Sequence, residues 1–423
     1  MAFTLTLSRA SKDPVSVAYG SSNGTATAGS DYVASAGTIT FAAGQISKTI
    51  NIGVVGDTNV EPNEAFTVTL SKPTQATLAR TVATGTVLND DIAPPPVTGV
   101  QWGDAFFSPY VSMSNWPVPN LLQLSQAGGA SLMNIGFIQA DNAGNPSWGG
   151  YSALEPTSTN SQAVAINKSI ADFKAANGDT MVSFGGAVGT SLSQYYSANN
   201  LGAQALADSY AHVANTYRVT HLDFDIEAAA LTNKDAVALQ TQAIKLLQLS
   251  NPKLQIWFTL PVTPTGLTAD SVNAVTSALR AGVKLAGVNV MTMDFGEYAA
   301  PTSGPNAQTM GTYTIAAAES TYSQLSALYS QYGLTYGWSQ LGVTPMIGVN
   351  DVTSEIFTLA DAQALENFAR TKGLGMLSMW SLLRDNPGTL GQVSDSTSGM
   401  NYPADSFSQV FDDYGTVNVV NYL

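Results

Sequence analysis

The sequence predicts a two-domain protein, with an all-β sandwich over residues 1–92 and an eight-stranded α/β barrel over residues 98–423. The first stretch alternates short Val-, Ile- and Thr-rich runs with turn clusters and has no helical period, which is typical of antiparallel sandwiches. Residues 93–97 contain three consecutive prolines, which form a stiff, extended spacer. Beyond it, apolar runs alternate with helix-length amphipathic segments, the pattern of parallel strands joined by crossover helices.

Six short strands are expected in the first domain, over residues 3–7, 15–19, 37–41, 48–54, 65–70 and 81–88. Four segments of this domain resemble the Calx-beta module: NGTATAGSDY at 23–32, GTITFAAGQ at 37–45, GDTNVEPNEAF at 56–66 and NDD at 89–91. The resemblance covers nearly the whole domain and implies an immunoglobulin-like sandwich. It also implies that the chain starts after the point where such modules complete their first strand, so we expect a truncated module.

Some modules of this family bind calcium through acids at one end of the sandwich, because calcium prefers hard oxygen ligands from several loops. The positions that match are Asp31, Asp57, Glu61, Asp90 and Asp91. Gly56 stands where the calcium-binding pattern has an acid. The resemblance therefore implies a possible calcium site, and the alternative is that these acids cap turns.

Eight strand–helix pairs are expected in the second domain. The strands cover residues 104–111, 131–140, 179–186, 219–227, 253–260, 286–294, 341–349 and 373–380. The helices that follow them cover residues 119–127, 160–176, 201–217, 232–249, 269–281, 313–332, 358–371 and 404–414. Eight such pairs fit a TIM barrel better than an open dinucleotide-binding sheet, because no Gly-x-Gly-x-x-Gly follows the first strand.

The composition excludes several functions. Acidic residues outnumber basic ones 30 to 16, which argues against a nucleic-acid partner. The chain has no cysteine and only two histidines, His212 and His221, which excludes thiolate and polyhistidine metal centres. No apolar run reaches the roughly 20 residues that cross a bilayer, and no basic-then-apolar leader begins the chain. We expect a monomer secreted by a bacterium, with its signal peptide removed.

The most unusual stretch is the fourth expected strand of the barrel. Alternate side chains of a strand point to opposite faces, so Asp223, Asp225 and Glu227 share one face while large apolar residues occupy the other. Three neighbouring acids repel one another and are costly to bury, which indicates a chemical purpose. The alternatives are an exposed acidic edge strand and a calcium site.

Other polar and aromatic residues fall at the ends of expected strands, where barrel active sites form. The third strand ends in Ser183-Phe184-Gly185-Gly186, the sixth in Met291-Thr292-Met293-Asp294 and the eighth in Trp380. Together with Asp223-x-Asp225-x-Glu227, this set resembles glycoside hydrolase family 18, the chitinases and their relatives. The segments at 108–111 and 148–150 also match bacterial members. The match spans the whole second domain in the right order.

The resemblance implies a mechanism in which the substrate assists its own cleavage. Glu227 is expected to be the general acid and base, and the substrate's 2-acetamido oxygen attacks the anomeric carbon to form an oxazolinium ion, with net retention. Asp225 orients the acetamido N–H, and Asp223 shares a proton with Asp225, helped by a hydrogen bond from Ser183. We expect repulsion along the row to raise the pKa of Glu227. No cofactor is required.

Two positions depart from the family signature. Thr220 replaces its first Asp and Met293 replaces a Tyr that would bond the acetamido group. Thr220 faces away from the acid row, so its effect is expected on support of the site. Met293 cannot donate a hydrogen bond. We therefore expect either Tyr110 or Tyr298 to supply a hydroxyl, or turnover to be slower.

The remaining substrate-binding predictions concern side chains that meet the sugar. Asp294 is expected to contact the acetamido group, Trp380 to form the floor under the sugar, and Trp148 and Trp116 to line neighbouring subsites. Gly185 and Gly186 make a tight turn or allow close approach of the substrate. Core packing is expected for the other tryptophans and a structural role for both histidines: Trp102, Trp257, Trp338, His212 and His221.

The sequence leaves the mode of action open. About eight residues separate the seventh strand from its helix, whereas relatives with deep clefts carry a small domain there. We therefore expect an open groove and internal cleavage, as in an endo-chitinase acting on chitin or chitooligosaccharides. The alternatives are an endo-β-N-acetylglucosaminidase acting on glycans, a catalytically weak chitin-binding protein on the same barrel, and a calcium-dependent adhesin.

Overall fold

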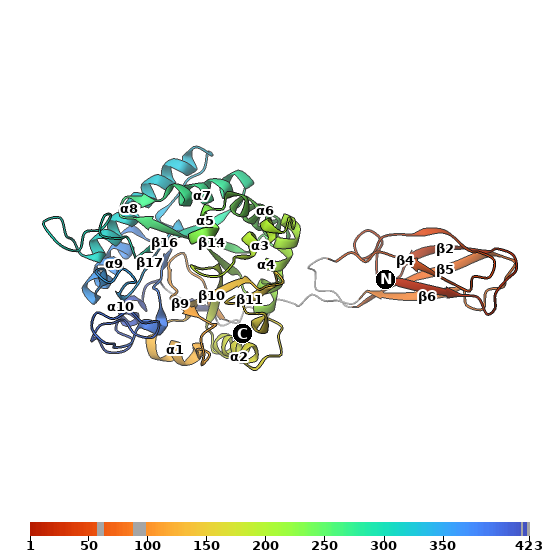
Figure 1. Ribbon diagram of the computed structural model, residues 1–423, viewed down its shortest axis with the longest axis horizontal. Coiled ribbons are helices and arrows are strands. Elements are labelled where there is room, and N and C mark those ends of the chain that lie inside the picture. The colour runs from red at the N-terminus through yellow and green to blue at the C-terminus, as the bar shows by residue number, and fades with distance from the viewer. Residues whose placement is uncertain (57–62, 88–98, 416–417, 421–423) are drawn as a thin grey trace. The chain divides into compact units, whose positions relative to one another are not determined.

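The computed structural model describes residues 1–56, 63–87, 99–415 and 418–420. The chain divides into two compact units, residues 1–94 and 95–423 (Figure 1). The predicted linker at 93–97 lies outside the described residues, as do Asp57, Glu61, Asp90 and Asp91. Each unit is described by itself below.

The N-terminal unit is made of β-strands, and all six expected strands are present. Their bounds are β1 Ala2–Thr6, β2 Val15–Asn23, β3 Ala36–Phe41, β4 Ser47–Asn51, β5 Glu64–Thr74 and β6 Val82–Val87. Strands β3-β2-β5-β6 form one antiparallel sheet and β1 pairs with β4 in another. Their apolar residues form one small core, in which the rings of Tyr32 and Phe66 stack 4.2 Å apart.

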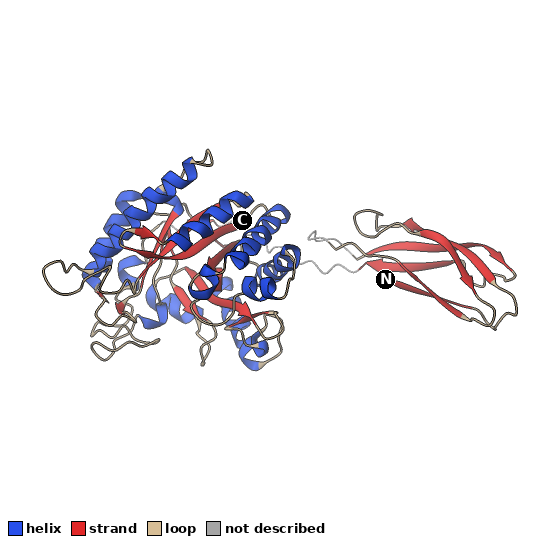
Figure 2. Ribbon diagram, turned by 45° about the horizontal axis from the view of Figure 1, so that its top comes forward, coloured by secondary structure: helices blue, strands red, loops and turns tan. Residues whose placement is uncertain are grey.

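The C-terminal unit is built on a curled sheet with helices around it (Figure 2). The main path is β11-β10-β12-β13-β14-β16-β17-β20-β8, and β9 pairs with β10. Its strands are β8 Phe106–Phe107, β9 Tyr110–Ser112, β10 Leu132–Ala140, β11 Pro146–Trp148, β12 Asp179–Gly185, β13 His221–Asp225, β14 Gln255–Thr263, β16 Leu285–Thr292, β17 Leu341–Pro345 and β20 Met376–Leu377. Shorter pairs flank it, formed by β15 Gly266–Leu267 with β14, β18 Gly348–Val349 with β19 Ile356–Phe357, and β7 Gly99–Gln101 with β21 Asn418–Val420.

The helices of this unit follow the strands in sequence. They are α1 Leu121–Gly128, α2 Ser161–Ala175, α3 Leu192–Ala198, α4 Ala203–Tyr217, α5 Ala228–Thr232, α6 Lys234–Ser250, α7 Ala269–Ala281, α8 Met310–Ser330, α9 Leu359–Lys372 and α10 Ser408–Phe411. Side-chain caps explain where several begin: Asn160, Thr268 and Thr309 each accept a hydrogen bond from a first-turn amide. None of the helices in the described ranges is long and apolar enough to cross a membrane.

Several predicted elements differ in extent. The first strand is split into β8 and β9, and the fourth ends at Asp225 rather than at residue 227. The seventh ends at Pro345, and the hairpin β18–β19 follows it. The expected last helix at 404–414 shrinks to α10, because Asp385 binds the amides of 407 and 408 and holds the preceding chain in a turn. Helices α3 and α5 were not predicted.

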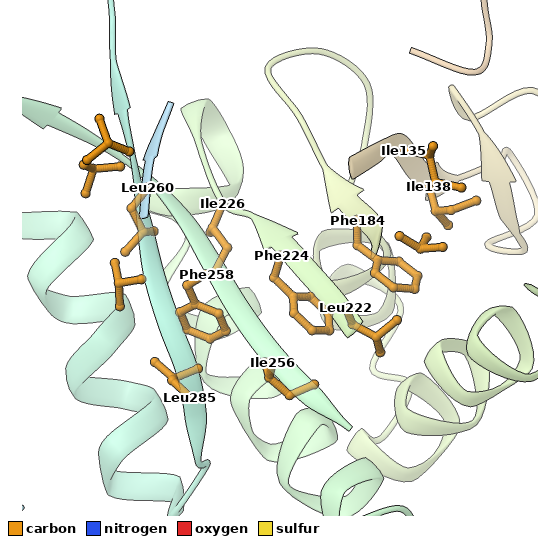
Figure 3. Close-up of a cluster of buried hydrophobic side chains, with 14 of the residues drawn as sticks. Ile135, Ile138, Phe184, Leu222, Phe224, Ile226, Ile256, Phe258, Leu260 and Leu285 are labelled. Carbon is orange, nitrogen blue, oxygen red and sulfur yellow. The ribbon is translucent and has the colours of Figure 1, made fainter. Parts of the chain in front are cut away.

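Apolar side chains of neighbouring strands form the core between the sheet and the helices. Figure 3 shows them in a row that runs across β10, β12, β13, β14 and β16. Phe224 of β13 lies at its centre: it stacks on Phe184 with ring centroids 5.3 Å apart and meets the edge of Tyr210 of α4 at 4.9 Å. The face of β13 opposite the acids is therefore anchored to the helices, which fixes where the acids point.

Candidate active site

The acid row lies at the end of β13. Asp223 and Asp225 belong to the strand and are almost fully buried, whereas Glu227 lies just beyond it, at the start of α5, and is partly accessible. Its backbone is still extended, with φ −141° and ψ 179°, so the alternation of the strand continues to Glu227. The predicted order of the three acids, from the interior to the surface, is therefore present.

Asp223 is surrounded by hydroxyl donors. The hydroxyls of Ser183 and Tyr110 donate to its Oδ2 at 2.7 and 2.8 Å, and the Thr259 hydroxyl donates to Oδ1 at 2.7 Å. These donors come from β12, β9 and β14, so three strands converge on one carboxyl group. Hydrogen bonds of this kind favour the charged carboxylate over the protonated acid.

Asp225 and Glu227 form a second environment. A hydrogen bond joins the carboxyl groups of these two residues. The buried Oδ1 of Asp225 has no hydrogen-bond partner among the described residues. A buried polar atom without a partner is costly, and a ligand that supplies an N–H would remove that cost.

Burial controls the protonation of the row. It raises the pKa of Asp223 to about 6, against the lowering effect of the three hydroxyl donors. Burial, followed by the charges of Glu227 and Asp223, raises the pKa of Asp225 well above its usual range. Burial also raises the pKa of Glu227 to about 7; the hydrogen bond from Asp225 lowers it and the charge of Asp294 raises it. Repulsion within the row, which we expected to dominate, is thus not the main cause for Glu227.

Two glycines at the end of β12, Gly185 and Gly186, leave room for the row. Gly185 has φ +116°, and a Cβ there would lie 2.0 Å from the backbone oxygen of Asp225. A Cβ on Gly186 would lie 3.0 Å from the ring of Phe137. Gly185 has no space for a side chain, whereas a Cβ on Gly186 would only crowd the Phe137 ring. Both glycines have positive φ, which adds strain for any other residue.

Trp380 forms part of an aromatic floor at the end of the eighth strand. Its half-buried ring stacks on Phe137 at 5.7 Å between centroids and lies 6.0 Å from the ring of Tyr110. Phe137 is also half-buried and was not predicted. Since sugar C–H faces pack on aromatic rings, the two side chains together provide a surface for a sugar.

Asp294 follows Met293 directly after β16 and has φ +50°, and the loop between β18 and β19 holds it in place. The amide of Val352 donates to its Oδ1 at 2.7 Å. The buried carboxylate of Glu355 accepts from the amides of Phe295 and Gly296 at 3.0 and 2.6 Å. The loop after the seventh strand therefore fixes the loop that carries Asp294, and partial burial raises the pKa of this acid.

Three predicted substrate contacts are not borne out by this geometry. Trp148 is fully buried and donates its indole N–H to Tyr217 at 2.7 Å, so its ring is core and lines no subsite. Tyr110 is also buried, and its hydroxyl serves Asp223 instead of a ligand. Tyr298 is fully exposed, with no packing to hold its hydroxyl over the site. Met293, next to Asp294, thus has no hydroxyl substitute among Tyr110 and Tyr298.

The other tryptophans and the two histidines singled out in the sequence lie partly in the core and partly at the surface. Trp116 is 71% exposed and Trp257 is buried. Trp102 donates to Asp179 at 2.8 Å and stacks on His221, whereas Trp338 stacks on Tyr322. Thr220 bonds the ring of His221 at 3.0 Å, away from the acids, and burial lowers the pKa of His221 to about 4. His212 lies exposed on α4.

Besides Phe137, the sequence analysis missed two polar residues near the acid row, Thr259 and Asn289. Both are buried at neighbouring positions of β14 and β16, in register with each other. The Asn289 amide donates to Thr259 at 3.0 Å and accepts from Thr344 at 2.9 Å. A signal existed, since Asn289 interrupts the apolar run Val288–Met291 on the inward side of the strand.

A metal site receives no support from the described residues, among which no group of three acids or histidines is placed to hold an ion. Asp31 is the one predicted calcium ligand within them. Its Oδ2 accepts from the amide of Thr27 at 2.5 Å, and this backbone hydrogen bond lowers the pKa of Asp31.

Comparison with known families agrees with this geometry. Residues 110–350 match the model of the glycosyl hydrolases family 18, and residues 1–91 match that of the Calx-beta domain. The chain belongs to glycosyl hydrolase family 18 and carries a Calx-beta domain before the catalytic domain.

Particular relatives can be named. The chain is 32% identical over 321 residues to a probable bifunctional chitinase/lysozyme of Escherichia coli K12, which covers 73% of this chain and 34% of that protein. It is also 32% identical over 303 residues to endochitinase 11 of Metarhizium anisopliae. This alignment covers 70% of this chain and 55% of that protein. The chain thus spans about a third and about half of the lengths of these curated relatives.

Solved structures are also similar. The catalytic domain of a hyperthermophilic chitinase from Pyrococcus furiosus shares 31% identity with a TM-score of 0.64, covering 74% of this chain and 96% of that one. Catalytic-site mutants of active domain 2 of a thermostable chitinase from the same organism, complexed with chito-oligosaccharides, share 30% identity at the same TM-score and cover 75% and 96%.

Proposed function

We propose that this protein is a retaining endo-chitinase that hydrolyses β-1,4-linked N-acetylglucosamine polymers by substrate-assisted catalysis. The observation that carries the proposal is the Asp225–Glu227 pair. One oxygen of Asp225 is buried and has no partner in the part of the chain that the structure describes. Glu227, hydrogen-bonded to Asp225, has a pKa raised to about 7. An acetamido N–H is the group that this Asp225 oxygen lacks.

In this mechanism Glu227 protonates the glycosidic oxygen while the acetamido oxygen closes on the anomeric carbon. The C–O bond to the leaving sugar breaks, and an oxazolinium ion forms on the sugar that remains. Asp225 then accepts the acetamido N–H and offsets the positive charge on the ring. Glu227, now ionised, takes a proton from water, which attacks the anomeric carbon and reopens the ring with retention.

The residues around the acid row support an open groove and a chitin substrate. Trp380 and Phe137 give the sugar at the cleavage point an apolar floor, and Asp294 contacts the acetamido group from the side. The segment after the seventh strand is the hairpin β18–β19, which favours an open groove and internal cleavage. Chitin chains and chitooligosaccharides fit these features, as do the names of the relatives.

We extend the proposal to the architecture. The domain limits are 1–92, 93–97 and 98–423, and the N-terminal unit is an immunoglobulin-like sandwich. Its family resemblance leaves calcium at Asp31, Asp57, Glu61, Asp90 and Asp91 as one alternative, and acids that cap turns as the other. Segment 106–112 supports a complete (β/α)8 barrel, because β8 pairs with β20 and β9 pairs with β10. The protein acts as a secreted monomer. Calorimetric titration with calcium that produces no heat would remove the metal from this proposal.

The test is hydrolysis of chromogenic chitobiose and chitotriose substrates by the wild type and by Glu227→Gln. The variant keeps the size of the side chain and loses the transferable proton, so the rate is expected to fall by about 10³-fold. Equal rates would contradict the assignment of Glu227. Proton NMR of the first product from chitohexaose is expected to show the β-anomer, and an initial α-anomer would rule out retention.

A further inference from the structure

Two of the hydroxyls that donate to Asp223, those of Tyr110 and Thr259, could instead donate to each other. The hydroxyls of Tyr110 and Thr259 lie 2.9 Å apart, and either can donate to the other. A hydroxyl carries one proton, so a Thr259 that donates to Tyr110 cannot donate to Asp223. Something must fix the direction of both protons if Asp223 is to keep its full set of three hydroxyl donors.

The amide of Asn289 lies on the far side of these two hydroxyls. Its Nδ2 donates to Thr259 Oγ1 at 3.0 Å and to Tyr110 Oη at 3.4 Å. Each oxygen that accepts from Asn289 keeps its own proton for another acceptor. The acceptors are the two oxygens of Asp223, which lie 2.7 Å from Thr259 and 2.8 Å from Tyr110.

The orientation of the Asn289 amide is itself fixed. The Thr344 hydroxyl of β17 donates to Asn289 Oδ1 at 2.9 Å, which directs the NH₂ group toward Thr259 and Tyr110. Gly342, the register partner of Asn289, makes room for the amide, since a Cβ there would lie 2.9 Å from Oδ1. All of these groups, Gly342 included, are buried, so bulk water does not compete.

We infer that Asn289 is a positioning residue: its amide fixes the direction of the Thr259 and Tyr110 hydroxyl protons and so holds Asp223 as the anion at the base of the acid row. The inference rests on the proposed function, in which an ionised Asp223 keeps the shared proton on Asp225 and Glu227. The chain of bonds runs from Thr344 through Asn289 to Asp223, across β17, β16, β14 and β13.

The charged surroundings make Asp223 a suitable reporter. The titratable groups that face it are Tyr110 of β9 and Asp225 of its own strand, with Glu227 beyond Asp225. The groups facing it from β12, β14 and β16 are the uncharged side chains of Ser183, Thr259 and Asn289. A change that adds no charge, such as Thr344→Val, therefore reaches Asp223 mainly through the hydroxyl protons.

Two variants test the inference. Asn289→Asp replaces the donating NH₂ by an oxygen, which accepts a hydrogen bond from Thr259 or Tyr110 and deprives Asp223 of a donor. Its new carboxyl group also adds a like charge near Asp223, so the uncharged Thr344→Val is the deciding variant. Thr344→Val removes only the bond that fixes the amide, and is the milder change if Asn289→Asp folds poorly. Asn134→Asp is the matched control, because Asn134 is equally buried in the same sheet but bonds Ser108 instead of the donors of Asp223.

The primary measurement is a carbon-13 NMR titration of protein labelled at the Asp carboxyl carbons, with Asp223 assigned from Asp223→Asn. Relative to wild type, the Asp223 midpoint is expected to rise by about one pH unit in Asn289→Asp and by less in Thr344→Val. It is expected to stay unchanged in Asn134→Asp. The acidic limb of the pH profile of kcat/KM on the chromogenic substrate is expected to move to higher pH in the same variants, most in Asn289→Asp and less in Thr344→Val.

The two measurements separate the inference from the proposed function. An unchanged Asp223 midpoint in Thr344→Val, even with a rise in Asn289→Asp, overturns the role of Asn289 whether or not the protein hydrolyses chitooligosaccharides. An equal rise in Asn134→Asp overturns it as well. If the wild-type protein shows no hydrolytic activity but the Asp223 midpoint still rises in the variants, the role of Asn289 is supported and the proposed function is rejected. Lower melting temperatures alone, without a shift of the midpoint, count against the inference.

Discussion

The two ends of the acid row differ in how their hydrogen bonds are satisfied. Asp223, at the inner end, accepts from three hydroxyls on three strands. At the outer end, Asp225 and Glu227 bond each other, and one Asp225 oxygen has no partner among the described residues. The hydrogen bonds of Asp223 are satisfied without a ligand, whereas those of Asp225 are not. We therefore expect the substrate to bind at the outer end of the row.

The difference also orders the charges along the row. Burial raises the pKa of all three acids, but only Asp223 has several donors that act against it. An anion at the inner end then favours a proton on Asp225 or Glu227. These interacting groups titrate together, so the pH profile reports the row and not one residue.

Asp225→Asn is the substitution in the row that should have the largest effect after Glu227→Gln. Asn keeps a hydrogen-bonding side chain but cannot carry the negative charge that offsets the oxazolinium ion in the proposed mechanism. We expect kcat to fall by about 10²-fold with a smaller change in KM. Steady-state kinetics on chromogenic chitobiose checks this, and an unchanged kcat would mean that the unpartnered oxygen has no catalytic role.

Ser183→Ala probes the inner end, where one donor of three is lost. We expect an activity loss of about tenfold and an acidic limb at higher pH, because Asp223 becomes easier to protonate. Ser108→Ala is the matched control: this buried serine donates to Asn134 at 2.7 Å instead of to the row. If both variants lost activity equally, the hydroxyl shell of Asp223 would be structural only.

Trp380→Ala and Trp148→Phe distinguish a sugar-binding ring from a core ring. Removing the half-buried floor at Trp380 is expected to lower kcat/KM by about tenfold, mostly through KM. Trp148→Phe loses the bond to Tyr217, so it should lower the free energy of unfolding by about 1 kcal/mol and leave KM unchanged. A raised KM in Trp148→Phe would restore Trp148 as a subsite residue.

The smallest effect concerns stability. A buried acid whose folded pKa is raised binds its proton more tightly folded than unfolded, so it destabilises the fold once pH exceeds its unfolded value. Glu227, raised to about 7, should therefore make the wild type progressively less stable than Glu227→Gln as pH rises from about 4 to 8. Thermal melts of both proteins over this range test the sign, and a constant difference would show that the pKa is not raised.

Much of the site could be predicted from the sequence because its signal is local. The alternation of Asp223, Asp225 and Glu227 with apolar residues needs only strand geometry, and Gly185 and Trp380 stand at strand ends. The structure brings Ser183 to Asp223 as expected. These residues share a periodicity or a motif that is visible within a few positions.

The residues that could not be predicted depend on how distant strands align. Thr259 is in register with Asp225 yet donates to Asp223, because neighbouring strands are inclined to one another. Trp148 looks like a surface aromatic after the second strand, but the path of the chain carries it under Tyr217 of α4. The cause of the Glu227 pKa was mistaken for the same reason: sequence spacing shows nearby charges, but not the depth of burial.

In the proposed mechanism Glu227 holds its proton up to about pH 7 and transfers it to the leaving sugar. The most direct measurement is kcat/KM on chromogenic chitobiose from pH 4 to 9 for the wild type and for Glu227→Gln. The wild type is expected to lose activity as pH rises through about 7, whereas the residual activity of the variant is expected to lack this basic limb. The same basic limb in Glu227→Gln would contradict the account.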